Sequence, residues 1–230
     1  MRKFAISDIH GCRKSFEALL DKIAFAQSDE LYLLGDYIDR GPDSKGVIDF
    51  IWRLQESDYQ VYCLKGNHEE LMLTAFEDDE DYKMNHWLMN GGVPTIQSFV
   101  TEDGKPDIPD AYFKFAESLE YYFEVDEFIL VHAGLNFKIP NPLTDEVSML
   151  WIRDWYERID QKWLGDRVIV HGHTPIAKEE IESQFVKLKK MPALDIDAGC
   201  VYAGKRPGMG YLCAFDLSDR VLHFQKNVED

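Results

Sequence analysis

The chain has little positive charge for its size. Its 230 residues include 25 Lys and Arg against 42 Asp and Glu, which gives a formal net charge of −17 at pH 7. Such a balance repels polyanions, so neither nucleic acid nor an anionic membrane surface is expected as a partner. The same charge repels phosphorylated molecules at long range. A site for phosphate would therefore need bound cations and arginines that reverse the potential locally.

Cysteine is also scarce, and long apolar runs are missing. The four cysteines (Cys12, Cys63, Cys200 and Cys213) lack the paired spacing of metal or redox motifs, so we expect reduced thiols. No apolar run is long enough to cross a bilayer. Charged residues begin at Arg2 and a strand-like segment follows directly, which does not fit a signal peptide. These features predict a cytoplasmic protein.

Neither repeats nor low-complexity segments divide the chain. With 45% hydrophobic residues, its length suffices for one substantial core. We therefore expect one catalytic domain over residues 1–230. Apolar runs at 3–7, 30–34 and 60–64 alternate with helical patterns at 13–25 and 44–56, and further helices are expected from about 69 to 120. Later strands are expected at 128–131, 167–170, 194–197, 210–217 and 220–225. This order predicts an α/β protein, with a helical insert over about 69–125 beside the cleft.

Five short polar motifs stand where apolar, strand-like runs end. They are Asp8-Ile9-His10-Gly11, Gly35-Asp36 leading into Asp39-Arg40-Gly41, Gly66-Asn67-His68-Glu69, His132-Ala133-Gly134 and Gly172-His173-Thr174. Ligands of open α/β sheets bind beyond the carboxyl ends of the strands, so we expect the five motifs to converge on one cleft. A single Asp-x-His or Gly-Asp is usually only a turn or a cap. Five such motifs in order at strand ends are difficult to explain in that way.

The residue types in these motifs suit two divalent metal ions. Asp8, His10 and Asp36 could hold a first ion, and Asn67, His132 and His173 a second, with Asp36 bridging both. Imidazole ligands favour manganese, iron or zinc over calcium, and manganese is our first expectation. Two metals about 3.5–4 Å apart can clamp the attacking and leaving oxygens of a phosphoryl displacement. An ionised water between them would attack phosphorus in line, so no serine or cysteine nucleophile is needed.

Four further residues fit the remaining tasks of phosphate-ester cleavage. His68 could protonate the leaving alkoxide, with the Asp39 carboxylate orienting its ring and holding it cationic. Arg40 could donate two hydrogen bonds to phosphate oxygens, a geometry that a lysine cannot copy. Arg153 is a second candidate for that role. An arginine beside tryptophans could instead stack or pair on the surface. We assign His171 a structural role.

These motifs resemble the calcineurin-like metallophosphoesterases, and within them the small bacterial and bacteriophage lambda-type serine/threonine protein phosphatases. The matching stretches are SDIHG at 7–11, GDYIDRGPDS at 35–44, KGNHEE at 65–70, VHAGL at 131–135, LWIR at 150–153, VHGHTP at 170–175 and DIDAGCVYAG at 195–204. The resemblance implies two mixed β-sheets flanked by helices. It also implies the metal ligands, the general acid His68 with Asp39, and the phosphate arginines Arg40 and Arg153 named above.

Three functions remain open from the sequence. The resemblance favours a metal-dependent phosphatase acting on phosphoserine, phosphothreonine or phosphotyrosine in proteins. The second is a hydrolase of diadenosine tetraphosphate or another small phosphate ester, and the third a non-catalytic phosphate-binding module. Relatives that cleave diadenosine tetraphosphate symmetrically usually lack the aspartate that stands here as Asp39, which favours phosphoproteins. Ala198 departs from the family, where Thr or Ser is frequent, and leaves substrate preference open.

Overall fold

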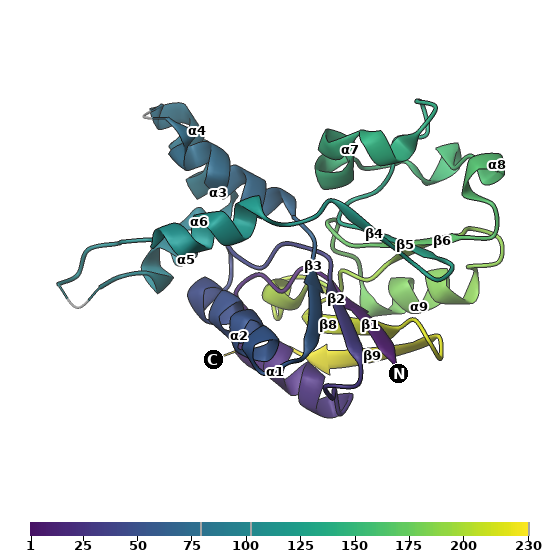
Figure 1. Ribbon diagram of the computed structural model, residues 1–230, viewed down its shortest axis with the longest axis horizontal. Helices are drawn as coiled ribbons and strands as arrows, with labels where there is room; N and C mark the ends of the chain where they lie inside the picture. Colours follow the sequence, from purple (N-terminus) through teal and green to yellow (C-terminus); the bar gives the residue numbers. More distant parts are fainter. Residues whose placement is uncertain (79, 102, 230) are drawn as a thin grey trace.

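Two mixed β-sheets form the centre of the protein. The computed structural model describes residues 1–78, 80–101 and 103–229. Within them, one sheet has the order β3-β2-β1-β8-β9 and the other the order β4-β5-β6-β7 (Figure 1). The strands are β1 (Lys3–Ile6), β2 (Glu30–Leu33), β3 (Gln60–Cys63), β4 (Tyr122–Val125), β5 (Phe128–Val131), β6 (Val168–His171), β7 (Ala193–Asp195), β8 (Tyr211–Asp216) and β9 (Val221–Lys226). β1, β2 and β3 are parallel, as are β5, β6 and β7, whereas β8, β9 and β4 run antiparallel to their neighbours.

Helices flank both sheets. They are α1 (Arg13–Lys22), α2 (Ser44–Glu56), α3 (Asn67–Glu77), α4 (Asp81–Trp87), α5 (Val93–Ser98), α6 (Asp110–Glu117), α7 (Glu146–Trp151), α8 (Gln161–Leu164) and α9 (Lys178–Val186), with a turn η1 (Leu88–Gly92), kinked at Gly91, between α4 and α5. In the described parts of the chain, no helix combines the length and the hydrophobicity that crossing a bilayer requires. The two helix-flanked mixed sheets confirm the fold class expected from the sequence.

The strands of the first sheet divide their side chains between two cores. Phe4 and Ile6 of β1 face α1 and α2, where they pack in one cluster with Phe16 and Val47. Ala5, between them in sequence, points the other way, into the space between the two sheets. This alternation follows from the two-residue period of a strand. Both faces are covered, which explains why the sequence of β1 is continuously apolar.

The second sheet is built in the same way. Leu130 of β5 and Val170 of β6 face the first sheet, where they share a buried cluster with Phe215 of β8. Ile129 and Ile169 face outward, against α7 and α8. The result is a helix–sheet–sheet–helix sandwich in which the carboxyl ends of β1, β2, β3, β5 and β6 lie toward one side.

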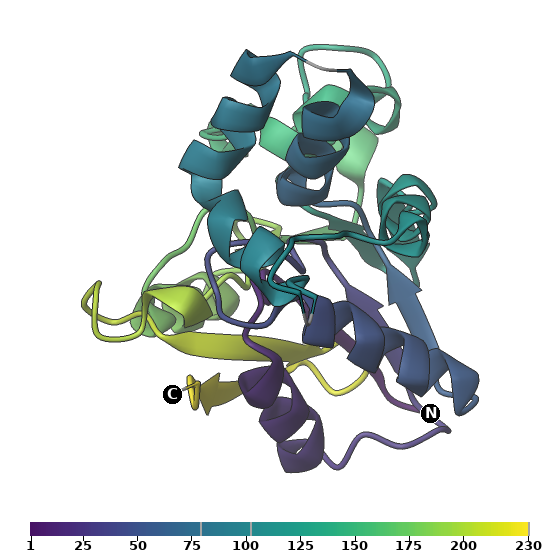
Figure 2. The same cartoon turned by 90° about the vertical axis from the view of Figure 1, so that its left-hand side faces the viewer.

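The segment between β3 and β5 differs in part from the expectation. It contains α3 to α6, as expected for a helical insert, and these helices project together from the sheets (Figures 1 and 2). Residues 122–125 are strand β4, however, which pairs antiparallel with β5. The sequence also did not reveal α7, α8 and α9. These helices are short, and their boundaries depend on tertiary packing more than on any apolar period.

A truncation at the contact between the sheets tests this architecture. The Phe215 ring is fully buried, and its centroid lies 5.6 Å from that of Phe128 in the opposite sheet, edge to face. We expect Phe215→Ala to lower the free energy of unfolding by about 3–5 kcal/mol, because it removes this contact and leaves a cavity. Urea denaturation would measure the change. Val186→Ala is the control, since Val186 is 83% exposed and should change stability by less than about 0.5 kcal/mol. Equal effects of the two variants would contradict the arrangement.

Candidate functional site

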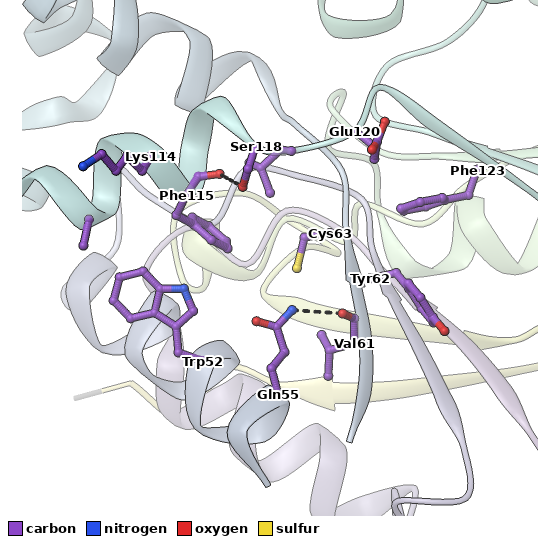
Figure 3. Close-up of a pocket in the computed structure, with 12 residues that line it drawn as sticks. Trp52, Gln55, Val61, Tyr62, Cys63, Lys114, Phe115, Ser118, Glu120 and Phe123 are labelled. Carbon is purple, nitrogen blue, oxygen red and sulfur yellow. Dashed lines mark hydrogen bonds between the residues drawn. The ribbon is translucent and has the colours of Figure 1, made fainter. Parts of the chain in front are cut away.

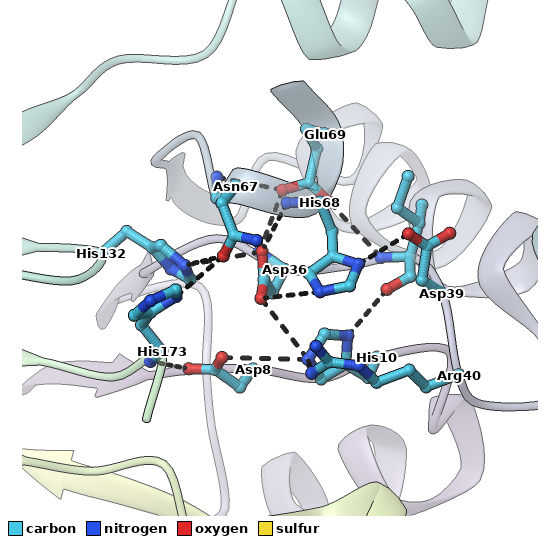
Figure 4. Close-up of polar contacts among 12 residues, drawn as sticks. Asp8, His10, Asp36, Asp39, Arg40, Asn67, His68, Glu69, His132 and His173 are labelled. Atoms are coloured by element: carbon cyan, nitrogen blue, oxygen red, sulfur yellow. Dashed lines mark hydrogen bonds and ion pairs between the residues drawn. The ribbon is translucent and has the colours of Figure 1, made fainter. Parts of the chain in front are cut away.

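The five motifs come together in one buried cluster, as their positions at strand ends predict. Figure 4 shows the side chains pointing toward one another from loops of both sheets. The loops after β1, β2, β5 and β6 and the first turn of α3 contribute Asp8, His10, Asp36, Asn67, His132 and His173, all of which are buried. The carboxyl ends of strands from two sheets therefore supply one concentrated set of oxygen and nitrogen acceptors.

Asp36 lies at the centre of this cluster. Its Oδ2 is 3.4 Å from His10 Nε2, and its Oδ1 is 3.5 Å from His132 Nε2. The side chain belongs to two groups whose ligand atoms all lie within 4.8 Å of one another: His10, Asp36 and His68 in one, and Asp36, His132 and His173 in the other. Two adjacent sites for metal ions could thus share one carboxylate.

Asp8 holds an acceptor that the protein does not satisfy. Its Oδ2 accepts a hydrogen bond from the His173 backbone N–H at 3.0 Å and another from the Ser7 hydroxyl. Its Oδ1 is buried and has no hydrogen-bond partner among the described residues, although it lies 3.9 Å from His10 Nε2. An unpaired buried carboxylate oxygen is costly, and a cation removes that cost. The residues present therefore fit a bound metal.

Asn67 joins the histidines of the second group. Its Oδ1 is 3.0 Å from His132 Nε2 and 2.8 Å from His173 Nδ1. Asn67 is the first residue of α3, directly after Gly66. A Cβ at Gly66 would overlap Asp36 Oδ1, so only glycine lets this turn approach the central carboxylate.

Backbone carbonyls orient two of the imidazoles. His10 Nδ1 lies 2.8 Å from Ile38 O, and His132 Nδ1 lies 2.8 Å from Leu34 O. A carbonyl only accepts, so each Nδ1 carries the proton and each Nε2 presents its lone pair to the cluster. Burial lowers the pKa of both histidines below the ordinary value. The neutral ring with a free Nε2 is the form that binds metals.

Burial has the opposite effect on the pKa of the central carboxylate, Asp36. Burial raises the pKa of Asp36 well above its ordinary range, and the charge of Asp8 raises it further. Neighbouring negative charge and low solvent access both disfavour a second anion at this position. A divalent cation between these groups would reverse the penalty, which again fits a metal centre.

His68 and Asp39 form a close pair at the edge of the cluster. His68 Nδ1 lies 2.6 Å from Asp39 Oδ2, while Nε2 faces inward, 3.9 Å from Asp36 Oδ2. Burial lowers the pKa of His68 well below its ordinary value, with Arg40 adding to the effect, and raises the pKa of Asp39 to about 7. The contact with Asp39 gives the His68 ring one orientation. That Asp39 also holds the ring cationic stays a prediction.

Both expected arginines reach the cluster. Arg40 Nη1 lies 2.7 Å from His10 Nε2, and Arg153 Nε donates to His173 Nε2 at 3.2 Å. Arg40 is half-buried, whereas Arg153 is exposed. Positive charge thus stands on either side of the cluster, where it could contact phosphate oxygens.

The backbone of the cluster is strained. Residues with φ between +46° and +74° include Asp8, His10, Asp36, Asp39, Arg40 and His173. Left-handed conformations are uncommon for residues other than glycine, and they concentrate at functional sites, where the surrounding structure must hold them. These turns bring the side chains at the strand ends into the buried cluster.

Three residues that support the cluster were not expected. The Glu69 carboxylate accepts the backbone N–H groups of Asp36 and Tyr37 at 3.0 and 2.8 Å. Its place as the third residue of α3 was a sequence signal that could have identified it. Trp87 and Thr95 donate hydrogen bonds to Asp39 from the helical insert. No motif surrounds them, and they follow Asp39 by 48 and 56 residues.

A separate groove lacks this chemistry. It encloses about 530 Å³ and is lined by side chains of α2, β3, α6 and β4, among them Trp52, Tyr62, Phe115 and Phe123 (Figure 3). No residue of the metal-binding groups lines it. The cluster of Figure 4, not the groove, is therefore the candidate site.

Comparisons with known proteins agree with this geometry. The family model of the calcineurin-like phosphoesterases matches residues 1–204. The chain is 27% identical to bis(5′-nucleosyl)-tetraphosphatase PrpE (asymmetrical) of Bacillus cereus, over 92% of this chain and 91% of that protein. It is 25% identical to the protein of the same name from Geobacillus thermodenitrificans, over 90% and 89%.

Solved structures show the same fold. A putative diadenosine tetraphosphatase aligns with a TM-score of 0.66 at 22% identity, over all of this chain and 95% of the other. A serine/threonine phosphatase from Saccharomyces cerevisiae with similarity to human phosphatase PP5 aligns with a TM-score of 0.67 at 16% identity, over all of this chain and 81% of the other. From the family match over most of its length, this chain belongs to the calcineurin-like phosphoesterase family.

Proposed function

We propose that this protein is a metal-dependent hydrolase that cleaves dinucleoside polyphosphates. The observation that best supports a metal-dependent hydrolase is the position of the Asp36 carboxylate. It is shared by two histidine-containing groups and lies near the unpaired Oδ1 of Asp8. Carboxylate, amide and imidazole groups buried together are unfavourable alone and favourable around cations.

Six residues of the cluster would bind the two metal ions. Asp8, His10 and Asp36 would hold one ion, and Asp36, Asn67, His132 and His173 the other. Manganese is the first choice for both, with iron and zinc as alternatives. When bound, such ions supply positive charge to the phosphate and lower the pKa of water enough to make it a nucleophile near neutral pH.

His68 would donate a proton to the leaving oxygen. Its Nε2 faces the cluster while Nδ1 is fixed by Asp39 at 2.6 Å, which gives the ring one orientation. When water attacks phosphorus, the bond to the leaving oxygen breaks and that oxygen takes the His68 proton. The contribution matters most for an alkoxide, because a strongly basic leaving group needs protonation more than a phosphate does.

Arg40 and Arg153 would bind the non-bridging oxygens. Each guanidinium already lies within hydrogen-bond distance of a cluster histidine, so each is within reach of a phosphate held there. Their donors would strengthen as charge develops on those oxygens.

The substrate class is supported by the relatives. Two of them, aligned over about nine-tenths of each chain, are named for the hydrolysis of bis(5′-nucleosyl) tetraphosphates. The sequence-based preference for phosphoproteins rested on Asp39 and on a contrast with symmetrical hydrolases. These relatives are named asymmetrical, so that contrast does not apply to them. A phosphoprotein remains the second candidate, favoured by the oriented His68–Asp39 pair, which suits an alkoxide leaving group.

A substrate comparison tests the proposal. Chelated protein, and protein reloaded with Mn²⁺, would be assayed side by side on diadenosine tetraphosphate and on a panel of phosphopeptides. We expect manganese-dependent cleavage of the dinucleotide, with a higher kcat/KM than for any phosphopeptide. Faster turnover of phosphopeptides would favour the second candidate. No turnover of either substrate would leave the phosphate-binding module as the better interpretation.

Substitution of His68 tests its role as the acid. We expect His68→Asn to lower kcat for a phosphoserine peptide by about 10²–10⁴-fold, and to lower it less for diadenosine tetraphosphate, whose leaving group is less basic. Metal content, measured by elemental analysis, should stay at the wild-type value. His86→Asn, at an exposed position of α4, is the matched control. Loss of metal would identify His68 as a ligand, consistent with its 3.9 Å approach to Asp36.

Substitution of Asp36 tests the shared ligand. Asp36→Asn keeps the shape but removes the charge between the two groups, so we expect loss of both metal occupancy and activity. Asp110→Asn changes the same functional group in an exposed ion pair of α6 and should alter neither. A fully loaded, active Asp36→Asn protein would overturn the bridging assignment.

A further inference from the structure

The Asp39 carboxylate is surrounded by donors from the helical insert. Trp87 Nε1, at the end of α4, lies 2.9 Å from Oδ2 and 3.1 Å from Oδ1. Thr95 Oγ1, in α5, lies 2.6 Å from Oδ1. Trp87, Thr95 and Asp39 are all fully buried. Together with His68 at Oδ2, these donors fix the carboxylate in one orientation.

Thr95 holds the backbone of the same residue. The Asp39 N–H donates to Thr95 Oγ1 at 2.9 Å and to Ser44 Oγ at 3.0 Å, and the two hydroxyls are 2.9 Å apart. Asp39 has a φ of +72°, a conformation that its surroundings must enforce. One threonine hydroxyl therefore contacts both the strained main chain and the carboxylate that it presents.

The kinked turn between α4 and α5 contacts Arg40, the residue that follows Asp39. The Arg40 N–H donates to Gly91 O at 2.9 Å. Gly91 has a φ of +115°, and a Cβ there would lie only 2.7 Å from Arg40 Cγ. A Cβ at Gly92 would lie 2.6 Å from the Trp87 ring. Two adjacent glycines of this kink therefore pack closely against Arg40 and against Trp87.

We propose that Trp87 and Thr95 are positioning residues that aim the Asp39 carboxylate at His68 Nδ1. Through that contact they direct His68 Nε2 toward the leaving oxygen of the substrate. This role rests on the proposed function, because it assigns the insert a part in proton donation. The insert thereby serves the chemistry directly, in addition to lying beside the cleft.

Conservative variants separate this role from packing. Trp87→Phe keeps an aromatic ring against Phe76, whose centroid is 5.7 Å away, and removes the indole N–H donor together with part of the ring volume. Thr95→Val keeps the shape and removes the hydroxyl. Trp52→Phe is the matched control, since Trp52 packs against Tyr112 and Phe115, apart from the cluster.

The expected signature is a dependence on the leaving group. For an alkyl phosphate, whose leaving alkoxide needs a proton, we expect kcat to fall about 10–100-fold in each variant, the usual effect of removing a residue that orients a ligand or catalytic group. For p-nitrophenyl phosphate, whose phenolate leaves without help, the loss should be several-fold smaller, and KM and metal content should not change. Trp52→Phe should match the wild type on both substrates. Equal losses on both would show a merely structural role and overturn the proposal, as would no loss on either.

A double-mutant cycle makes the test specific. If Trp87 acts through His68, then Trp87→Phe should lower kcat for the alkyl phosphate in the wild type and have almost no further effect in His68→Asn. Additive losses in the double variant would place Trp87 on another path and contradict the proposal.

An activity-independent measurement separates this proposal from the proposed function. The proton between His68 and Asp39 should give a downfield resonance in the proton NMR spectrum, identified by its loss in His68→Asn. In Trp87→Phe and Thr95→Val we expect that resonance to shift upfield or to broaden by exchange. An unchanged resonance would refute the positioning role even in an active enzyme. A shifted resonance in a protein that hydrolyses none of the substrates would leave positioning intact and count against the proposed function.

Discussion

The central constraint on this structure is the burial of carboxylate oxygens and imidazole nitrogens in one cluster where hydrogen-bond donors do not satisfy all of them. Asp36 lies within 3.5 Å of nitrogens from two histidines, and Asp8 keeps an oxygen with no hydrogen-bond partner in the described chain. Such a cluster opposes folding unless a cation enters it. The apolar clusters that cover both sheets offset this unfavourable free energy. Backbone hydrogen bonds hold the loops that carry the cluster residues. A bound cation would therefore stabilise the folded chain as well as the site.

The backbone around the cluster explains how the acceptors are kept in place. Glu69 accepts two consecutive N–H groups of the turn that begins at Asp36, so the turn cannot relax toward an extended strand. On the other sheet, Gly172 allows its loop to approach the cluster closely, because a Cβ there would overlap Asp8 and Ser7. Strain and close approach are thus concentrated where the ligands meet, while the strands behind them are regular.

Those elements that local sequence patterns encode were predicted correctly. Continuous apolar runs ending in polar motifs identified β1, β2, β3, β5 and β6, and the shared direction of these strands placed Asp36 beside His132 and His173 before any distance was known. What the sequence did not reveal depends on pairing or long-range contact. β4 is an edge strand recognisable only from its pairing with β5, and short helices such as α7 carry too few turns for a clear period. The burial of His68, which lowers its pKa, is likewise a property of the folded site and cannot be read from a local pattern.

The role of Asp39 shows why one motif position is weak evidence for a substrate. From sequence, its presence favours an enzyme that must protonate an alkoxide. In the structure the same carboxylate also accepts hydrogen bonds from two buried donors of the insert, Trp87 and Thr95. Its loss would leave the buried Trp87 N–H unpaired, at a cost of about 1–3 kcal/mol, and would remove one hydrogen bond of the Thr95 hydroxyl. A chain with this insert therefore has reason to keep Asp39 whichever phosphate compound it cleaves. The presence of Asp39 is thus explained by its hydrogen bonds to the insert. The choice between a phosphoprotein and a dinucleotide depends instead on residues that contact the substrate beyond the phosphate.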